Sequence, residues 1–310
     1  MNSENSWPKI AVVGAGAVGG YFGGMLARAG APVIFIGRPS FVEAVQKNGL
    51  LLDTTTFKES VRIEASANLS AARGAEIVLF CVKTTDTAST ARELASVLAP
   101  GAILVSMQNG ADNAEQIHAA SGLNALAAAV YVAASCPAPG TVKHVGRGDL
   151  VLGPENEHTR RVAEIFIRAK VSCRISENLA GELWTKLVWN CALNALSALG
   201  KVTYGEIIAS ADAKQLLEGT VYEVLAVAKA AGIKPSGLED PLAALAGAYK
   251  IAEQMAVTRS STAQDMMRGK KTEIDSLNGF IARKGRELGV PTPLNHALYT
   301  LVKLAEASSG

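Results

Sequence analysis

The sequence predicts an α/β protein, with a doubly wound, mainly parallel sheet in its N-terminal part and an all-helical C-terminal domain. Short apolar runs rich in Val, Ile and Leu alternate with helical stretches in the first part. From about Ser176 onward, the pattern is helical almost throughout. A chain of 310 residues is long enough for two domains. We place the boundary at residue 176, which gives domains 1–176 and 177–310.

Four apolar runs are predicted to be strands of the sheet. They are residues 9–13 (KIAVV), 31–38 (APVIFIGR), 75–83 (AEIVLFCVK) and 101–110 (GAILVSMQNG). None alternates between apolar and polar residues, which is typical of parallel strands that are buried on both faces. Helices are expected between them, notably over residues 87–98 and 112–120. This β-α-β order indicates a doubly wound sheet.

The end of the first domain has a different sequence pattern. Residues 141–153 (TVKHVGRGDLVLG) place two glycines between β-prone runs, which predicts a hairpin. A helix over 155–169 and a strand over 171–175 are expected next. Ser176 is the expected N-cap of the long helix that opens the second domain.

Composition and charge limit the kinds of binding partner that the sequence predicts. The 30 basic and 28 acidic residues are well mixed, and no basic block indicates nucleic acid. The longest apolar run, 125–136, is too short to span a bilayer, and the N-terminal MNSENSWPK lacks the regions of a signal peptide. The four cysteines form no CxxC pair, and the scattered histidines show no metal-ligand spacing. We therefore predict a reduced, cytoplasmic, enzyme-like protein with no metal, nucleic-acid or membrane partner.

A glycine motif follows the first predicted strand and opens a helix. Gly14 permits a tight turn, Gly16 lets a pyrophosphate approach the backbone, and Gly19 lets helix and strand pack closely. The helix N-terminus adds free N–H groups and a partial positive charge for the phosphates. The motif stands in the context that it requires, so it predicts a Rossmann-type dinucleotide site. The whole loop is expected to contact the cofactor: Gly14, Ala15, Gly16, Ala17, Val18 and Gly19.

The second predicted strand indicates which dinucleotide binds. It ends in FIGRPS, without the Asp or Glu that an NAD site places there for the ribose hydroxyl. Arg38 lies in this segment, where a guanidinium can take a 2′-phosphate through forked hydrogen bonds. The sequence therefore favours NADP over NAD, and the alternative is an exposed surface arginine.

A polar stripe interrupts an apolar helix at residues 183–196 (LWTKLVWNCALNAL). Lys186, Asn190 and Asn194 follow one another at intervals of four, so they share one face of the helix. An exposed face would carry mixed charges, and asparagine is a poor residue for a helix interior. The stripe predicts the wall of a polar cleft. The alternative is a set of satisfied polar residues at a helix contact.

A second polar segment, residues 260–279 (SSTAQDMMRGKKTEIDSLNG), carries Glu273. Taken alone, Glu273 could be an ordinary solvated charge beside its basic neighbours. Paired with a lysine in a cleft, it would be an acid–base partner.

These segments together resemble the ketopantoate reductases (2-dehydropantoate 2-reductases). The resemblance is carried by VGAGAVGGYFGGMLARAG, FCVKTTD, MQNGADN, LWTKLVWNCALNAL and SSTAQDMMRGKKTEIDSLNG, in that order. It extends over nearly the whole chain, to the tail PTPLNHALYTLV. It implies NADPH-dependent reduction of ketopantoate to pantoate, a step toward pantothenate and coenzyme A.

The resemblance also implies roles for individual residues. Lys186 would be the catalytic lysine, and Glu273 its carboxylate counterpart. The other residues would line the two binding sites: Asn190, Asn194 and Ser261 for the substrate, Lys83 for the cofactor, and Asn109 for both.

Tyr204, in VTYGEI, departs from the asparagine expected from some family members. This keeps open a related NADP-dependent reductase for a different 2-oxo acid. A 3-hydroxy-acid dehydrogenase also sets a lysine and an asparagine on such a helix, but the TEID segment argues against it. A non-catalytic NADP-binding sensor is the alternative from a different class. The oligomeric state stays open, with a homodimer as one candidate.

Overall fold

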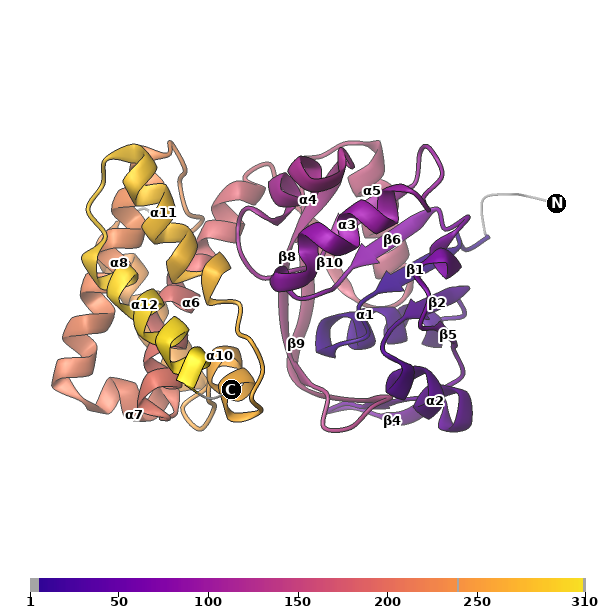
Figure 1. Ribbon diagram of the computed structural model, residues 1–310, viewed down its shortest axis with the longest axis horizontal. Coiled ribbons are helices and arrows are strands. Elements are labelled where there is room, and N and C mark those ends of the chain that lie inside the picture. The colour runs from indigo at the N-terminus through magenta and orange to yellow at the C-terminus, as the bar shows by residue number, and fades with distance from the viewer. Residues whose placement is uncertain (1–5, 239, 309–310) are drawn as a thin grey trace. The chain divides into compact units, whose positions relative to one another are not determined.

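The computed structural model describes residues 6–238 and 240–308, and the chain divides into two compact units, Met1–Leu179 and Ala180–Gly310. The first unit is built on a sheet flanked by helices, and the second is helical, so the predicted fold class is confirmed (Figure 1). The division falls at Leu179, whereas the sequence placed the boundary at residue 176. Residues 1–5, on which part of the signal-peptide argument rests, lie outside the described residues.

A parallel sheet forms the centre of the first unit. Its strands are β1 (Ile10–Val13), β2 (Val33–Ile36), β5 (Glu64–Ser66), β6 (Ile77–Phe80), β7 (Ile103–Ser106) and β8 (Ala125–Ser135). They pair in parallel in the order β5-β2-β1-β6-β7-β8. The order reverses between β1 and β6, and ligands of doubly wound sheets bind at such a point, beyond the carboxyl ends of the strands.

The sheet continues past β8 as a mixed sheet. The additional strands are β3 (Leu50–Asp53), β4 (Lys58–Val61), β9 (Thr141–Leu152) and β10 (Ser172–Ile175). β9 runs antiparallel to β8 and parallel to both β3 and β10, while β4 runs antiparallel to β3.

The hairpin expected within residues 141–153 is wrong, because β9 is one continuous strand. Arg147 and Asp149 pair with consecutive residues of β8, so Gly148 is the extra residue of a β-bulge. Its φ of 149° favours glycine, and a Cβ there would lie 2.4 Å from the hydroxyl oxygen of Tyr21. The glycines therefore mark an irregularity in a long strand, and the chain reverses between β8 and β9 instead.

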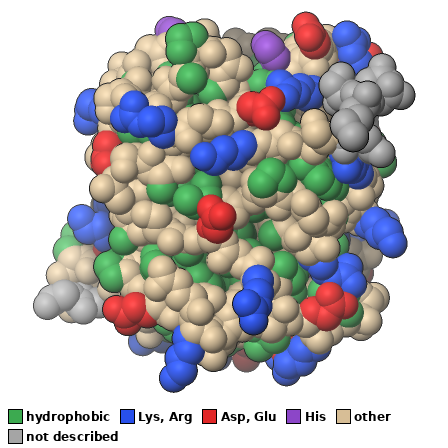
Figure 2. Space-filling model, turned by 90° about the vertical axis from the view of Figure 1, so that its right-hand side faces the viewer, with side chains coloured by type: hydrophobic (Ala, Val, Ile, Leu, Met, Phe, Trp, Pro, Cys, Tyr) green, Lys and Arg blue, Asp and Glu red, His purple; other side chains and the backbone are tan. Residues whose placement is uncertain are grey.

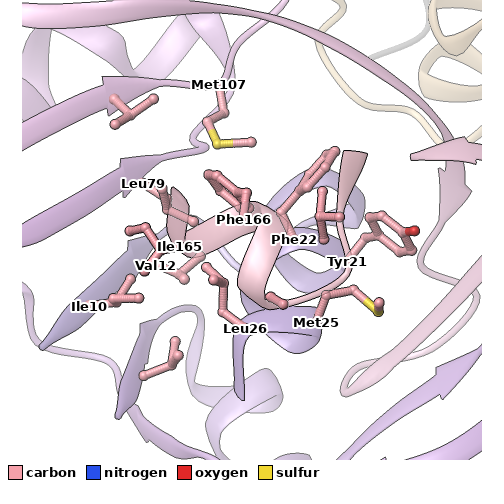
Figure 3. Packing of buried hydrophobic residues seen from close by; sticks show 14 of the residues in the cluster. Ile10, Val12, Tyr21, Phe22, Met25, Leu26, Leu79, Met107, Ile165 and Phe166 are labelled. Carbon is pink, nitrogen blue, oxygen red and sulfur yellow. The ribbon is translucent and has the colours of Figure 1, made fainter. Parts of the chain in front are cut away.

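Helices cover both faces of the parallel sheet. They are α1 (Ala17–Arg28), α2 (Pro39–Asn48), α3 (Thr87–Ala95), α4 (Asn113–Ser121) and α5 (Glu157–Arg168). Ile10 and Val12 of β1 belong to a core cluster with Phe22 of α1 and Phe166 of α5 (Figure 3). The alternate residues of β1 point into a second cluster with residues of α3 and α4. Both faces of β1 are therefore buried, as its unbroken apolar run predicts.

The second unit consists of helices. They are α6 (Leu179–Gly200), α7 (Tyr204–Ala209), α8 (Ala211–Ala230), α9 (Pro241–Gln254), α10 (Ser261–Met267), α11 (Asn278–Leu288) and α12 (Pro293–Ser308), with the 3₁₀ turn η4 (Ile274–Ser276). Ser176 is not the N-cap of α6. Its hydroxyl accepts a hydrogen bond from the Asn178 amide at 3.2 Å, which forms a turn ahead of the helix.

Two features of the described residues concern possible contacts with a membrane or with a charged partner. No helix among them is both long and apolar enough to cross a membrane. On the face shown in Figure 2, Lys and Arg side chains are scattered among acidic and hydrophobic ones.

Candidate active site

The glycine loop after β1 is shaped partly by the packing of the protein itself. Gly14 has a φ of 102°, and a Cβ on it would lie 2.6 Å from the carbonyl carbon of Cys81. A Cβ on Gly19 would lie 2.2 Å from the carbonyl oxygen of Gly14. The fold therefore requires glycine at both positions, for the turn and for the contact between α1 and the sheet.

Gly16 is different, because nothing in its own unit explains the glycine. Its φ of −83° and ψ of −164° suit any residue, and a Cβ would meet no atom within 4 Å. Gly16 is also the N-cap of α1 and, having no side chain, makes no capping hydrogen bond. An open approach to the backbone at an uncapped helix N-terminus fits the pyrophosphate of a dinucleotide.

Arg38 lies next to this loop. It is exposed, and it is the N-cap residue of α2, directly after Gly37. The Gly37 amide donates to the carbonyl oxygen of Ser66 at 3.0 Å, and a Cβ on Gly37 would lie 2.9 Å from that of Ala15. The turn after β2 is thus packed against the turn after β1, and Arg38 lies at the carboxyl edge of the sheet.

Gln108 holds together two loops of the same edge. Its amide nitrogen donates to the carbonyl oxygen of Val82 at 3.0 Å and to the hydroxyl of Thr87 at 2.7 Å. Its amide oxygen accepts from the hydroxyl of Ser106 at 3.1 Å. The buried Gln108 side chain therefore joins the end of β7 to the loop after β6 and the start of α3.

Lys83 and Asn109 are carried by these two loops. Lys83 precedes the 3₁₀ turn η3 (Thr84–Asp86), and both residues are half-buried. The carbonyl oxygen of Asn109 accepts a hydrogen bond of 2.7 Å from the side-chain amide of Asn113, in the first turn of α4. The cofactor residues expected in the first unit thus follow the carboxyl ends of β1, β2, β6 and β7.

In the second unit, α6 carries the whole polar stripe. Lys186 and Asn190 are half-buried, whereas Asn194 is only 3% exposed. The oxygen of the Asn194 side chain accepts a hydrogen bond of 3.0 Å from the hydroxyl of Tyr204, the first residue of α7. The side-chain oxygen of Asn194 is therefore a satisfied polar group at a contact between two helices, which is the alternative reading of the stripe given by the sequence.

Ser260 fixes the start of α10 against α6. Its amide donates to the Ser197 hydroxyl at 3.0 Å, and its own hydroxyl donates to the backbone carbonyl of Asn194 at 3.0 Å. The Ser260 hydroxyl also accepts from the amide of Ala263, as a helix N-cap does. Ser261, the expected substrate residue, is the next residue and is exposed.

Glu273 is half-buried and directly precedes η4. A buried polar network holds the residues that follow it. Asn278 donates to the backbone carbonyl of Cys191 in α6 at 3.1 Å and to the side chain of Asn295 at 3.0 Å. Glu223 of α8 accepts in turn from the side chain of Asn295 at 2.9 Å. Because buried polar groups are costly unless paired, this network ties the start of α11, just after the TEID segment, to the middle of α6.

Asp275, two residues after Glu273, makes local contacts. It accepts hydrogen bonds from the Tyr299 hydroxyl and the Lys303 ammonium, each at 2.9 Å. Partial burial opposes the charge on Asp275, but the two hydrogen bonds and the positive charges of Lys303 and Arg283 together outweigh it and lower the pKa of the carboxyl group. Asp275 therefore stabilises the packing of α12 onto η4.

Comparison with known proteins identifies the family. A family model described as "Ketopantoate reductase PanE/ApbA" matches residues 10–157, and its C-terminal counterpart matches residues 178–306. The chain belongs to the ketopantoate reductase family. The resemblance carried by the five sequence segments is therefore confirmed.

Individual relatives agree over nearly the full length. The 2-dehydropantoate 2-reductase of Pyrococcus horikoshii is 32% identical over 306 residues, which cover 97% of this chain and 99% of that protein. A PanE/ApbA family ketopantoate reductase from Ralstonia eutropha superposes with a TM-score of 0.92 at 46% identity and covers 97% of this chain and 99% of its own. The 2-dehydropantoate 2-reductase of Geobacter metallireducens has a TM-score of 0.87 at 27% identity, with 96% and 99% covered.

Membership of the ketopantoate reductase family makes this chain a dinucleotide-dependent oxidoreductase that acts on a small molecule. Sequence reasoning missed Gln108 and Ser260, and it singled out Tyr204 without finding its partner Asn194. These roles become visible only through contacts between residues that are 21, 66 and 10 positions apart. The QNG motif was the one local signal that pointed near Gln108.

Proposed function

We propose that this chain reduces 2-dehydropantoate to pantoate with NADPH as its preferred cofactor. Family membership over nearly the whole chain supports the reaction. The observation that carries the proposal is the row of Lys186, Asn190 and Asn194 on one face of an otherwise apolar helix. Dinucleotide binding is assigned to the first unit, and substrate binding and proton transfer to the helical unit.

The first unit would hold the dinucleotide. The open backbone at Gly16 and the N-terminus of α1 suit its pyrophosphate, with the loop from Gly14 to Gly19 around it. Arg38 suits the 2′-phosphate, because no carboxylate stands in the FIGRPS segment to repel it. Lys83 and Asn109 complete the set from the same edge of the sheet. When the reduced cofactor is bound, its nicotinamide supplies the hydride for the keto carbon.

Lys186 would carry the proton chemistry. Negative charge develops on the carbonyl oxygen during reduction, and the Lys186 ammonium stabilises it by a hydrogen bond. Nζ of Lys186 then gives its proton to that oxygen, which forms the hydroxyl of the product. A well-placed donor of this kind lowers the barrier by roughly 3 kcal/mol.

The neighbouring polar residues would orient the substrate. Asn190, Asn194 and Ser261 can donate hydrogen bonds to its carboxylate, and Asn109 is proposed as a further substrate residue. Glu273 can accept a hydrogen bond from the substrate hydroxyl and keep the Lys186 ammonium oriented. Holding the keto carbon in a fixed position removes much of the entropic cost of the reaction.

A substrate and cofactor panel tests this function. NADPH oxidation is followed with 2-dehydropantoate and with several other 2-oxo acids, and NADH is tested in parallel. Fast turnover of 2-dehydropantoate with NADPH supports the proposal. Turnover restricted to another 2-oxo acid would favour the second candidate, a related reductase, for which the buried Tyr204 beside Asn194 is the specific reason. NADPH binding without any turnover would favour a sensor.

A further inference from the structure

Tyr204 is held firmly beside the polar stripe. Its side chain is 7% exposed, and its backbone amide donates to the carbonyl oxygen of Thr258 at 3.0 Å. Thr203 and Glu206 form a capping box around the start of α7, in which each residue accepts a hydrogen bond from the other's amide. The position of the phenol is therefore fixed by its own helix start and by the segment that leads into α10.

The direction of the hydrogen bond between Tyr204 and Asn194 matters chemically. A carboxamide has an acceptor oxygen and a donor nitrogen of nearly equal size, so only its partners decide which way it faces. The Tyr204 hydroxyl donates to the Asn194 oxygen. Burial raises the pKa of the Tyr204 phenol, so this hydroxyl keeps its proton at neutral pH. The Asn194 oxygen is thus occupied, and its NH₂ group is turned the other way.

We infer that Tyr204 is a positioning residue that turns the NH₂ group of Asn194, a hydrogen-bond donor, toward the substrate. A 2-oxo acid has two acceptor-only groups, the keto oxygen and the ionised carboxylate. Since Lys186 is proposed to donate to the keto oxygen, the NH₂ group of Asn194 matches the carboxylate. An NH₂ group does not match a hydroxyl that needs an acceptor for its proton. Asn194 therefore recognises the carboxylate end of the substrate, and Tyr204 sets that choice through Asn194. This inference rests on the proposed function, because it takes Asn194 to line the substrate site.

A purely structural role for the same hydrogen bond makes a different prediction. If Tyr204 only joined α7 to α6, its loss would lower thermal stability without changing substrate affinity. If it acts through Asn194, substrate affinity must fall, and that fall must depend on Asn194 being present.

The experiment is a double-mutant cycle with Tyr204→Phe, Asn194→Ala and the double variant. The Kd of 2-dehydropantoate is measured by calorimetry without reduced cofactor, so that no turnover occurs, and KM, kcat and Tm are measured beside it. Tyr204→Phe is expected to raise Kd and KM about tenfold, as loss of one buried hydrogen bond does, with a smaller change in kcat. In the Asn194→Ala background, the same change is expected to leave Kd unaltered.

Matched variants separate this effect from general damage. Tyr249→Phe also removes a tyrosine hydroxyl that donates within the helical unit, to Glu218, and neither residue belongs to α6. It is expected to change Tm but not Kd. Asn194→Asp keeps an oxygen for Tyr204 but loses the donor, and it is expected to weaken binding at least as much as Asn194→Ala. If Asn194→Ala folds poorly, Asn194→Leu, which keeps the side-chain volume, replaces it in the cycle.

The outcomes separate this inference from the proposed function. Turnover by the unaltered chain, together with equal effects of Tyr204→Phe in both backgrounds, would overturn the inference alone. An unchanged Kd in Tyr204→Phe with a lowered Tm would do the same. Failure of the unaltered chain to bind or reduce any 2-oxo acid would overturn both.

Discussion

The carbonyl oxygen of Gly14 lies 2.2 Å from the place that a Cβ on Gly19 would occupy, whereas a Cβ on Gly16 would meet nothing within 4 Å. Two glycines of one motif are thus required by the fold, and the third is not. The proposed contact of the Gly16 backbone with the pyrophosphate would explain why the third position is also glycine.

Gly16→Ala is expected to fold normally and to bind NADPH at least tenfold more weakly, because the new methyl group would intrude on the pyrophosphate at a cost of about 1–3 kcal/mol. Gly19→Ala is expected to destabilise the first unit by at least about 1–3 kcal/mol, since its Cβ meets the backbone. Thermal unfolding and fluorescence titration with NADPH measure the two effects. Normal NADPH affinity in Gly16→Ala would place the pyrophosphate elsewhere.

Arg38→Asp is expected to weaken NADPH binding about 100-fold and NADH binding little, because a charge-assisted contact to the 2′-phosphate becomes a repulsion. Arg62→Asp is a matched control. Arg62 is also exposed, but it precedes β5 and so lies at the opposite end of the β2–β5 pair. The test measures the dissociation constants of NADPH and NADH for both variants and for the unaltered chain. An unchanged cofactor preference in Arg38→Asp would show that Arg38 does not contact the 2′-phosphate.

Lys186→Ala and Glu273→Ala are each expected to lower kcat by about 100-fold or more, since each removes a group that acts on the reacting substrate. Neither residue belongs to the sheet unit, so the Kd of NADPH is expected to stay within about twofold. Lys214→Ala, which removes an exposed lysine of α8, controls for loss of charge. Near-normal kcat in both active-site variants would end the proposed mechanism.

Asp275 gives the helical unit a pH-dependent contribution to stability. Its pKa is lowered below the ordinary value of 3.8, so the contribution is present above that pH and is lost as the pH falls through the folded-state pKa. Asp275→Asn is expected to lower stability at pH 7 by about 1 kcal/mol or less, since the ion pair with Lys303 is partly exposed. The difference in Tm from the unaltered chain is expected to vanish in acid. A difference that persists at pH 2 would assign the effect to packing.

The parts of the fold that the sequence predicts well are encoded locally. β1, β2 and β6 are unbroken apolar runs, β7 departs from this at its last residue, Ser106, and the glycine loop carries its own turn geometry. β5 was not predicted, because its three residues EAS form no apolar run; in the structure they pair with β2, and Ala65 packs against the core. β9 was misread because a glycine in a bulge has the same local sequence as a glycine in a turn.

The candidate site, like the fold, was predicted from the sequence only in part. Lys186, Asn190 and Asn194 could be found because helical periodicity alone puts them on one face. The residues that contact Asn194 could not be predicted from the sequence. Ser260 reaches Asn194 across 66 positions of sequence, and Tyr204 shows its role only because α7 turns back onto α6. Single serines and tyrosines give no pattern by which such contacts could be anticipated.

The central claim is transfer of a hydride to the keto carbon of 2-dehydropantoate with Lys186 as the proton donor. The most direct measurement uses NADPH deuterated at the transferable position of its nicotinamide and detects the product by mass spectrometry. We expect pantoate with one deuterium at C2, formed by the unaltered chain and at least about 100-fold more slowly by Lys186→Ala. Pantoate formed equally fast by Lys186→Ala, or no deuterated pantoate from the unaltered chain, would contradict the central claim.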